Sequence, residues 1–142
     1  MNVFFDTSSL FKLYHKESGT EKLLEFFDNN TINKIYLAEI SRIEFSSTVW
    51  KKCRKHEIGE KVAKVVIDRF KKDSSKFTFI TDSSDLKSLA CELIEKYWSI
   101  GLRTLDSIQL ASGLSIKEEI DYFFTSDTIL KKVSESEGFK DK

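Results

Sequence analysis

Four short runs of aromatic and β-branched residues predict buried β-strands. They lie at residues 3–5, 35–37, 77–80 and 122–124. The segments between them have helical periodicity. Strands that are separated by a dozen or more helical residues need crossover connections, which favour parallel pairing. We therefore expect an α/β fold, a three-layer α/β/α sandwich with a mainly parallel sheet of four to five strands.

Apolar residues at three- and four-residue spacing predict the buried faces of four helices. The clearest face consists of Leu86, Leu89, Ala90, Leu93, Ile94 and Tyr97. Two others consist of Ile58, Val62, Val65, Val66 and Phe70, and of Leu105, Ile108, Ala111 and Ser112. A fourth, whose serines would let a neighbour pack close, consists of Ile43, Ser46, Ser47, Trp50 and Cys53.

Length and composition favour one globular domain over residues 1–142. The chain is 40% hydrophobic with 12 phenylalanines, and it has no proline and only five glycines to interrupt its elements. No repeat, low-complexity segment or linker divides it. Cys53 and Cys91 fall within helical apolar patterns at a spacing that matches no metal or redox motif, so we expect two reduced core residues.

The N-terminal residues lack the basic region and long apolar run of a signal peptide, and no stretch approaches the roughly 20 apolar residues of a membrane span. We expect a cytoplasmic protein without membrane contact. The 23 basic and 23 acidic residues give a net charge of zero, which argues against a general nucleic-acid coat. A nuclease remains possible, because a carboxylate cluster would offset basic residues elsewhere.

Four acidic residues occupy positions that a parallel sheet could bring to one rim, because functional crevices lie beyond the carboxyl ends of the strands. Asp6 directly follows the first predicted strand, and Asp127 follows the last one by three residues. Glu44 and Asp106 lie in the early turns of predicted helices. Together the four form a candidate acidic site.

Each acid also has a purely structural explanation. Asp6 and Asp127 could cap helices, Ser41 and Glu44 have capping-box spacing, and Asp106 could complement a helix dipole. Converging carboxylates, however, repel one another unless a cation lies between them. Mg²⁺ prefers such oxygen ligands, and the two histidines are too isolated to predict a softer metal. The conjunction favours a Mg²⁺ or Mn²⁺ site.

At these acids the sequence resembles the PIN domain family, and within it the VapC-type toxins of toxin–antitoxin pairs. Four blocks carry the resemblance in order: residues 3–14 around Asp6, 42–44 around Glu44, 105–112 around Asp106 and 124–130 around Asp127. The resemblance implies that these four acids are catalytic and metal-binding. It further implies a Mg²⁺- or Mn²⁺-dependent ribonuclease that hydrolyses RNA, forms a homodimer and is inhibited by a cognate antitoxin.

The chain departs from that family in three places. The family usually continues after its fourth acid through a helix into a final strand, whereas residues 137–142 stop short. We therefore expect that edge strand to be shortened or missing. Gln109 stands where the family often has His, and Gly113 where it often has Ala. We expect both changes to affect packing more than chemistry.

Several other polar residues are candidates for the site or its surroundings. Ser8 and Thr125 could orient waters or a carboxylate, or serve as caps and turn residues. Arg103 could hold a substrate phosphate, or be only a solvated charge. Glu39 could replace Glu44 as a ligand, although the resemblance favours Glu44.

Two further polar segments have simpler explanations. Asp82 follows the third predicted strand, but the segment Asp82-Ser83-Ser84-Asp85 is best interpreted as the cap of the helix that follows it. A basic run could meet RNA, although such runs are more often solvated helix faces. It comprises Lys51, Lys52, Arg54 and Lys55.

Other functions fit the residues less well. A phosphatase of the haloacid-dehalogenase type needs a second Asp two positions after the first, where this chain has Ser8. A receiver domain needs an acidic pair at the end of its first strand, and that pair is absent. An inactive PIN-like assembly module and a PIN nuclease of RNA processing stay open, although the presence of all four acids argues against lost activity.

Overall fold

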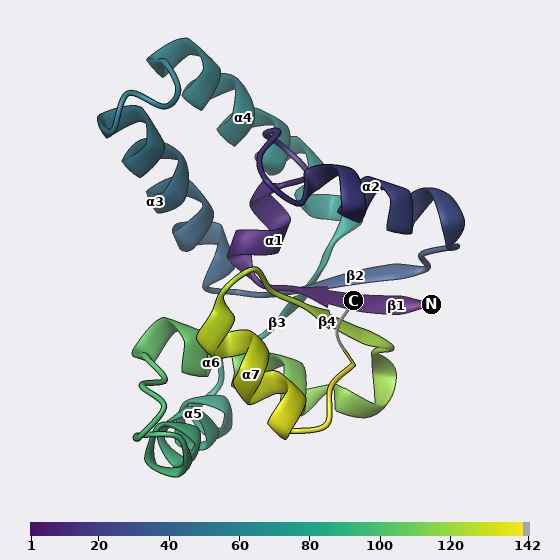
Figure 1. The fold of residues 1–142 in the computed structure, drawn as a ribbon, viewed down its shortest axis with the longest axis vertical. Coiled ribbons are helices and arrows are strands. Elements are labelled where there is room, and N and C mark those ends of the chain that lie inside the picture. The colour runs from purple at the N-terminus through teal and green to yellow at the C-terminus, as the bar shows by residue number, and fades with distance from the viewer. Residues whose placement is uncertain (141–142) are drawn as a thin grey trace.

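A parallel sheet lies between two layers of helices in the computed structural model, which describes residues 1–140 (Figure 1). Its strands are β1 (Asn2–Phe5), β2 (Lys34–Ala38), β3 (Thr78–Ile80) and β4 (Tyr122–Phe124). They form a 4-stranded sheet in the order β3-β2-β1-β4, and all three pairings are parallel. The predicted α/β class and the four strand positions are confirmed.

The helices divide between the two faces of the sheet (Figure 1). One layer contains α1 (Thr7–Phe11), α2 (Thr20–Asn29), α3 (Ser41–Arg54) and α4 (Glu60–Asp73). The other contains α5 (Ser84–Lys96), α6 (Thr104–Ser115) and α7 (Thr128–Ser136). Two 3-10 turns, Ser74–Lys76 and Lys117–Glu119, precede β3 and β4. None of these helices within residues 1–140 has the length and apolar character needed to cross a bilayer.

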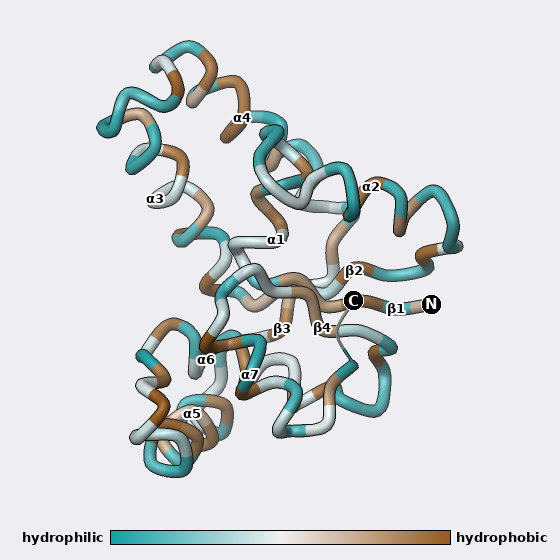
Figure 2. The backbone as a smooth tube through the Cα atoms, viewed as in Figure 1, coloured by the Kyte–Doolittle hydropathy of each residue, from teal (hydrophilic) through white to brown (hydrophobic). Residues whose placement is uncertain are grey.

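Alternating side chains of β1 supply a separate core on each face of the sheet, since neighbouring residues of a strand point to opposite sides. Phe5 packs in the core beneath α1–α4, and Phe4 in the core above α5–α7. Phe4 stacks on Phe123 and Phe5 lies against Phe124, each pair with ring centroids 4.9 Å apart. The apolar strands sandwiched between amphipathic helices are visible in Figure 2.

The predicted buried face of α3 is wrong. Phe45 and Val49 are fully buried, whereas Ile43 is 69% and Trp50 40% exposed. Phe45 decides the orientation, because its ring lies 4.2 Å from that of Phe70 on the neighbouring α4. The helix carries two apolar stripes, and the hairpin of α3 with α4 buries the one that was not predicted.

The predicted face of α4 is partly wrong for the same reason. Val66 and Phe70 are buried as expected, but Val62 and Val65 are about half exposed. Ala63 and Ile67 are buried in their place.

The two helices on the other face agree better with their patterns. On α5 the buried residues are Leu86, Ala90 and Leu93, with Tyr97 just beyond the helix. On α6, Ala111 and Ser112 are buried, but Leu105 is 45% exposed.

The two cysteines were expected to be reduced and buried in the core, and the structure confirms only part of this. Both are free thiols, but Cys53 is half-buried against the core and Cys91 is exposed. Cys91 follows the buried Ala90 by one position, and this step of roughly 100° turns its side chain towards solvent. Its position in an apolar pattern therefore did not imply burial.

No strand follows α7 in residues 1–140, in line with the expected shortening of the final edge strand. The backbone returns beside β4 only where the N–H of Phe123 donates to the carbonyl of Lys140 at 3.3 Å. Asp141 and Lys142, which belong to the same expected segment, lie outside the described residues.

Candidate active site

Asp6 lies between β1, which ends at Phe5, and α1, which begins at Thr7. Its backbone N–H donates to the Phe124 carbonyl at 3.0 Å, which extends the contact between β1 and β4 by one residue. Its carboxylate accepts from the Ser9 N–H at 2.8 Å, the geometry of a helix N-cap. The Ser8 hydroxyl lies 2.8 Å from both carboxylate oxygens, and the Thr125 hydroxyl donates to one of them at 2.6 Å. Asp6 is therefore a helix cap, but its second carboxylate oxygen is held by the turn that follows β4.

Burial raises the pKa of Asp6 to about 6. The hydrogen bonds from Thr125, Ser9 and Ser8 lower this pKa but do not offset the lost hydration, and the charge of Glu44 raises it further. An ionised Asp6 is thus held at a cost in free energy, which a cation bound to the carboxylate would relieve.

A buried polar network fixes Glu44. Its Oε1 accepts from the Gln109 side-chain amide at 2.7 Å and from the Thr7 hydroxyl at 3.1 Å. The same amide nitrogen lies 3.0 Å from the Ser41 hydroxyl and 3.2 Å from that of Thr7. Gln109 is 2% exposed, and its Oε1 is buried without a hydrogen-bond partner among residues 1–140. The amide therefore points its donor side at the acid.

Asp106 lies in the first turn of α6, and its pKa is raised to about 6. Burial is the largest cause, followed by the charge of Asp127, while Arg103 lowers the pKa and Glu44 raises it. The pKa of Asp106 is therefore raised by the charges of two of the other three acids, which belong to different elements. The charges of Asp127 and Glu44 thus reach Asp106 across three different elements of the fold.

Asp127 caps α7 through the N–H of Leu130, which donates to its carboxylate at 2.8 Å. Its own N–H donates to the Thr125 hydroxyl at 3.1 Å, and that hydroxyl donates in turn to Asp6. The N–H of Ser126 donates to the Ser8 hydroxyl at 3.0 Å. The turn after β4 thus positions Asp6 and Asp127 together.

Arg103, the residue before α6, is exposed. With Glu44 and Asp106 it borders a hollow of about 550 Å³, which is also lined by apolar residues of α5, of α6 and of the loop between them. The hollow is therefore lined by one positive charge, that of Arg103, and by the carboxylates of Glu44 and Asp106.

The donors fit a hard divalent cation, although residues 1–140 contain no ready-made group of three acidic, histidine or cysteine side chains that could hold a metal. Mg²⁺ is commonly bound by only one or two protein carboxylates, with waters and substrate phosphate as its other ligands. Asp6 and Asp106 are the two acids of the site whose pKa values burial raises, so a cation bound to either would favour its ionised form.

The structure decides both expected helix caps. Ile40, rather than Ser41, precedes α3, and the Ser41 hydroxyl bonds to Gln109, so Ser41 and Glu44 do not form the capping box that their spacing allowed. The segment before α5 is a cap as predicted, because Ser83 accepts from the Leu86 N–H at 3.1 Å.

The alternative ligand Glu39 is engaged elsewhere, because its carboxylate pairs with Arg42 at 2.7 Å. In the basic run, Lys52 pairs with Glu17 and Glu57, both at 3.3 Å. Sequence reasoning missed Thr7 as a contact of Glu44, since nothing in the spacing of single residues links α1 to α3.

The family model of the PIN domain matches residues 3–136, and the chain belongs to the PIN domain family. Because PIN domains are nucleases, membership of this family supports nuclease activity for the chain. None of the curated proteins compared with the chain matches it.

Solved structures share this fold at low sequence identity. VapC20 of Mycobacterium tuberculosis, described as a Sarcin-Ricin loop cleaving toxin, has a TM-score of 0.72 and 15% identity, over 97% of this chain and 96% of that chain. FitAcB of Neisseria gonorrhoeae has a TM-score of 0.67 and 13% identity, over 94% of this chain and 93% of that chain. VapBC2 of Rickettsia felis, solved with a DNA fragment from its promoter, has a TM-score of 0.60 and 19% identity, over 93% of this chain and 92% of that chain.

Proposed function

We propose that the protein is an endoribonuclease that hydrolyses RNA phosphodiester bonds with Mg²⁺ or Mn²⁺. The observation that carries the proposal is the pair of carboxyls with a pKa of about 6, Asp6 and Asp106, each affected by the charge of Glu44. They lie at the carboxyl ends of a parallel sheet, in a fold whose family consists of nucleases.

In this proposal Asp6, Glu44 and Asp106 hold the cation directly or through water, and Asp127 adds charge or a second, weaker site. The bound cation supplies a water of lowered pKa and stabilises charge on the phosphoryl oxygens. Burial and fixed donors keep Asp6 in one orientation, and Gln109 does the same for Glu44. Arg103 is placed to attract a substrate phosphate towards Asp106.

The experiment that tests the activity is cleavage of RNA by purified protein with Mg²⁺ or Mn²⁺. We expect Asp6→Asn and Asp106→Asn to lower the rate on the order of 100-fold or more, and EDTA to abolish it. Asp82→Asn is the matched control, because Asp82 only pairs with Lys87 at 3.6 Å on the surface. Undiminished cleavage by Asp6→Asn, or in excess EDTA, would refute the mechanism. No cleavage by the unaltered protein would favour the inactive assembly module.

We further propose that the protein is the toxin of a toxin–antitoxin pair, acts as a homodimer and is inhibited by an antitoxin protein. The likeness to VapC20, FitAcB and VapBC2 supports this role over one in RNA processing. Expression of the protein should then arrest growth, and expression of Asp6→Asn should not. Co-expression of the product of a short gene directly upstream should restore growth. Normal growth of cells expressing active protein would contradict the toxin role.

A further inference from the structure

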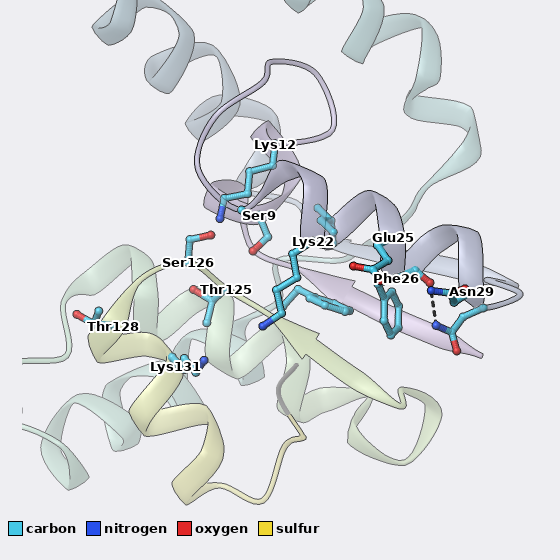
Figure 3. A pocket seen from close by; sticks show the side chains of 14 residues that line it. Ser9, Lys12, Lys22, Glu25, Phe26, Asn29, Thr125, Ser126, Thr128 and Lys131 are labelled. Carbon is cyan, nitrogen blue, oxygen red and sulfur yellow. Dashed lines mark hydrogen bonds between the residues drawn. The ribbon is translucent and has the colours of Figure 1, made fainter.

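A pocket of about 520 Å³ lies between α2 and the start of α7, beside the carboxyl end of β4 (Figure 3). Three lysines line it, Lys12, Lys22 and Lys131, together with one acid, Glu25. In Figure 3 the amines of Lys12 and Lys22 both point into the space between α2 and the turn after β4. The pocket therefore has a basic interior although the chain as a whole is neutral.

The pocket adjoins the acidic site directly. Its wall includes Ser9 and Thr125, two of the residues that donate hydrogen bonds to the Asp6 carboxylate, at 2.8 and 2.6 Å. On its other side the acidic site borders the hollow next to Arg103. The carboxylates consequently lie between two hollows, and a chain-like substrate with its reacting phosphate at the acids would extend into both.

Two of these lysines, Lys12 and Lys22, are available for an anionic ligand. Within the described residues, neither Lys12 nor Lys22 forms an ion pair, whereas Lys52 and Lys96 are each paired with glutamates. Lys12 is half-buried, and its ammonium lies over Gly19 so closely that a Cβ there would be 2.7 Å from it. A partly buried, unpaired ammonium attracts a phosphate more strongly than a fully solvated one.

The remainder of the pocket suits a base rather than a second phosphate. Phe26 and Phe124 form an apolar wall, with ring centroids 5.0 Å apart. Asn29 ends the same helix as Phe26 and supplies an amide group of the kind that bonds base edges. Asn30, the residue after the helix, also lines the pocket, and its side-chain amide donates to the Phe26 carbonyl at 2.8 Å. Single-stranded nucleic acids are commonly bound by this combination of lysines for the backbone and aromatic side chains for the base.

We propose that this pocket is a nucleotide subsite for single-stranded RNA, in which Lys12 and Lys22 bind a phosphate next to the scissile one and the base lies between α2 and α7. The subsite rests on the proposed ribonuclease function. It restricts the substrate class to unpaired RNA, because a base within a duplex could not enter the pocket.

Binding of a fluorescent eight-nucleotide RNA, followed by anisotropy in EDTA so that no cleavage occurs, tests the subsite. We expect the double variant Lys12→Gln/Lys22→Gln to bind about 10-fold more weakly at low salt. The slope of log K against log salt should fall by about 0.7, since Lys12 and Lys22 share one phosphate and each phosphate neutralised on a single strand contributes about 0.7. Lys61→Gln/Lys64→Gln, two exposed lysines of α4, removes the same charge elsewhere and should bind as the unaltered protein does.

The outcomes separate the subsite from the cleavage. If the Lys12/Lys22 variant binds as tightly as the control pair, the subsite is refuted even if RNA is cut. If binding depends on these lysines but Mg²⁺ and Mn²⁺ give no cleavage, the subsite stands and the proposed activity fails. Competition by a nucleoside monophosphate should exceed that by inorganic phosphate. Equal competition would reduce the pocket to a simple anion site and overturn the proposed place of the base.

Discussion

The side-chain amide of Gln109 donates a 2.7 Å hydrogen bond to the carboxylate of Glu44, across 65 positions of the sequence. Gln109 belongs to α6 and Glu44 to α3, so the bond joins the two helical layers at the edge of the sheet. The sequence suggested that this position matters mainly for packing. The contact shows instead that it holds one of the four acids.

Replacing Gln109 by Met should therefore weaken both the fold and the site. The change removes the donor from a partly buried carboxylate, which typically costs about 1–3 kcal/mol of unfolding free energy. It should also lower the affinity for Mn²⁺ by about 10- to 100-fold, as loss of an orienting contact does at other metal sites. Urea unfolding and Mn²⁺ titration calorimetry measure the two effects. Gln109→His, which keeps a ring N–H donor, should retain more Mn²⁺ affinity, and equal affinities would contradict the orienting role.

The stability of the metal-free protein should fall as the pH rises from about 4 to about 6. In this range folded Asp6, with its pKa raised from 3.8 to about 6, keeps a proton that the unfolded chain releases. Unfolding free energy decreases with pH wherever the folded state binds more protons, and the shift corresponds to about 3 kcal/mol above pH 6. Asp6→Asn should show a smaller decrease in urea unfolding across this range. An identical pH dependence of both proteins would show that the carboxyl is not perturbed.

Thr125→Val should raise the pKa of Asp6 further, because the lost hydroxyl donates to its carboxylate at 2.6 Å. The same hydroxyl accepts from the Asp127 N–H, so the turn after β4 should also loosen. We expect a loss of about 1 kcal/mol in unfolding free energy and a shift of the rate–pH profile to higher pH. Thr128→Val, an exposed residue of α7, is the control. A profile that shifts equally in both variants would contradict the role of Thr125.

Gly113→Ala should destabilise the protein by about 1–3 kcal/mol. A Cβ at this position would lie 2.6 and 2.8 Å from two ring atoms of Phe123, which is fixed in the core by stacking on Phe4. Adding Phe123→Leu should recover part of the loss, and thermal unfolding of both variants measures it. Full stability of Gly113→Ala alone would show that Phe123 can move.

The strands could be predicted from sequence because each is a compact run of aromatic and β-branched residues. The face of α3 could not, because Ile43 and Trp50 make as good a stripe as Phe45 and Val49, and only packing against α4 decides between them.

The four acids could be named from their positions relative to strands and from the family resemblance. The contact between Gln109 and Glu44, and the pocket that joins Lys12 and Lys22 to the turn after β4, depend on tertiary structure. No spacing along the chain encodes either of them.

The bond from Thr125 to Asp6 spans 119 positions, and β4 is the last strand of the sheet to be synthesised. A nascent chain that has not yet reached residue 122 already contains three of the acids. It lacks both the Phe124 carbonyl that binds the Asp6 N–H and the hydroxyl that binds the Asp6 carboxylate. The contacts that hold Asp6 can therefore form only after the last strand of the sheet and the turn that follows it have been synthesised.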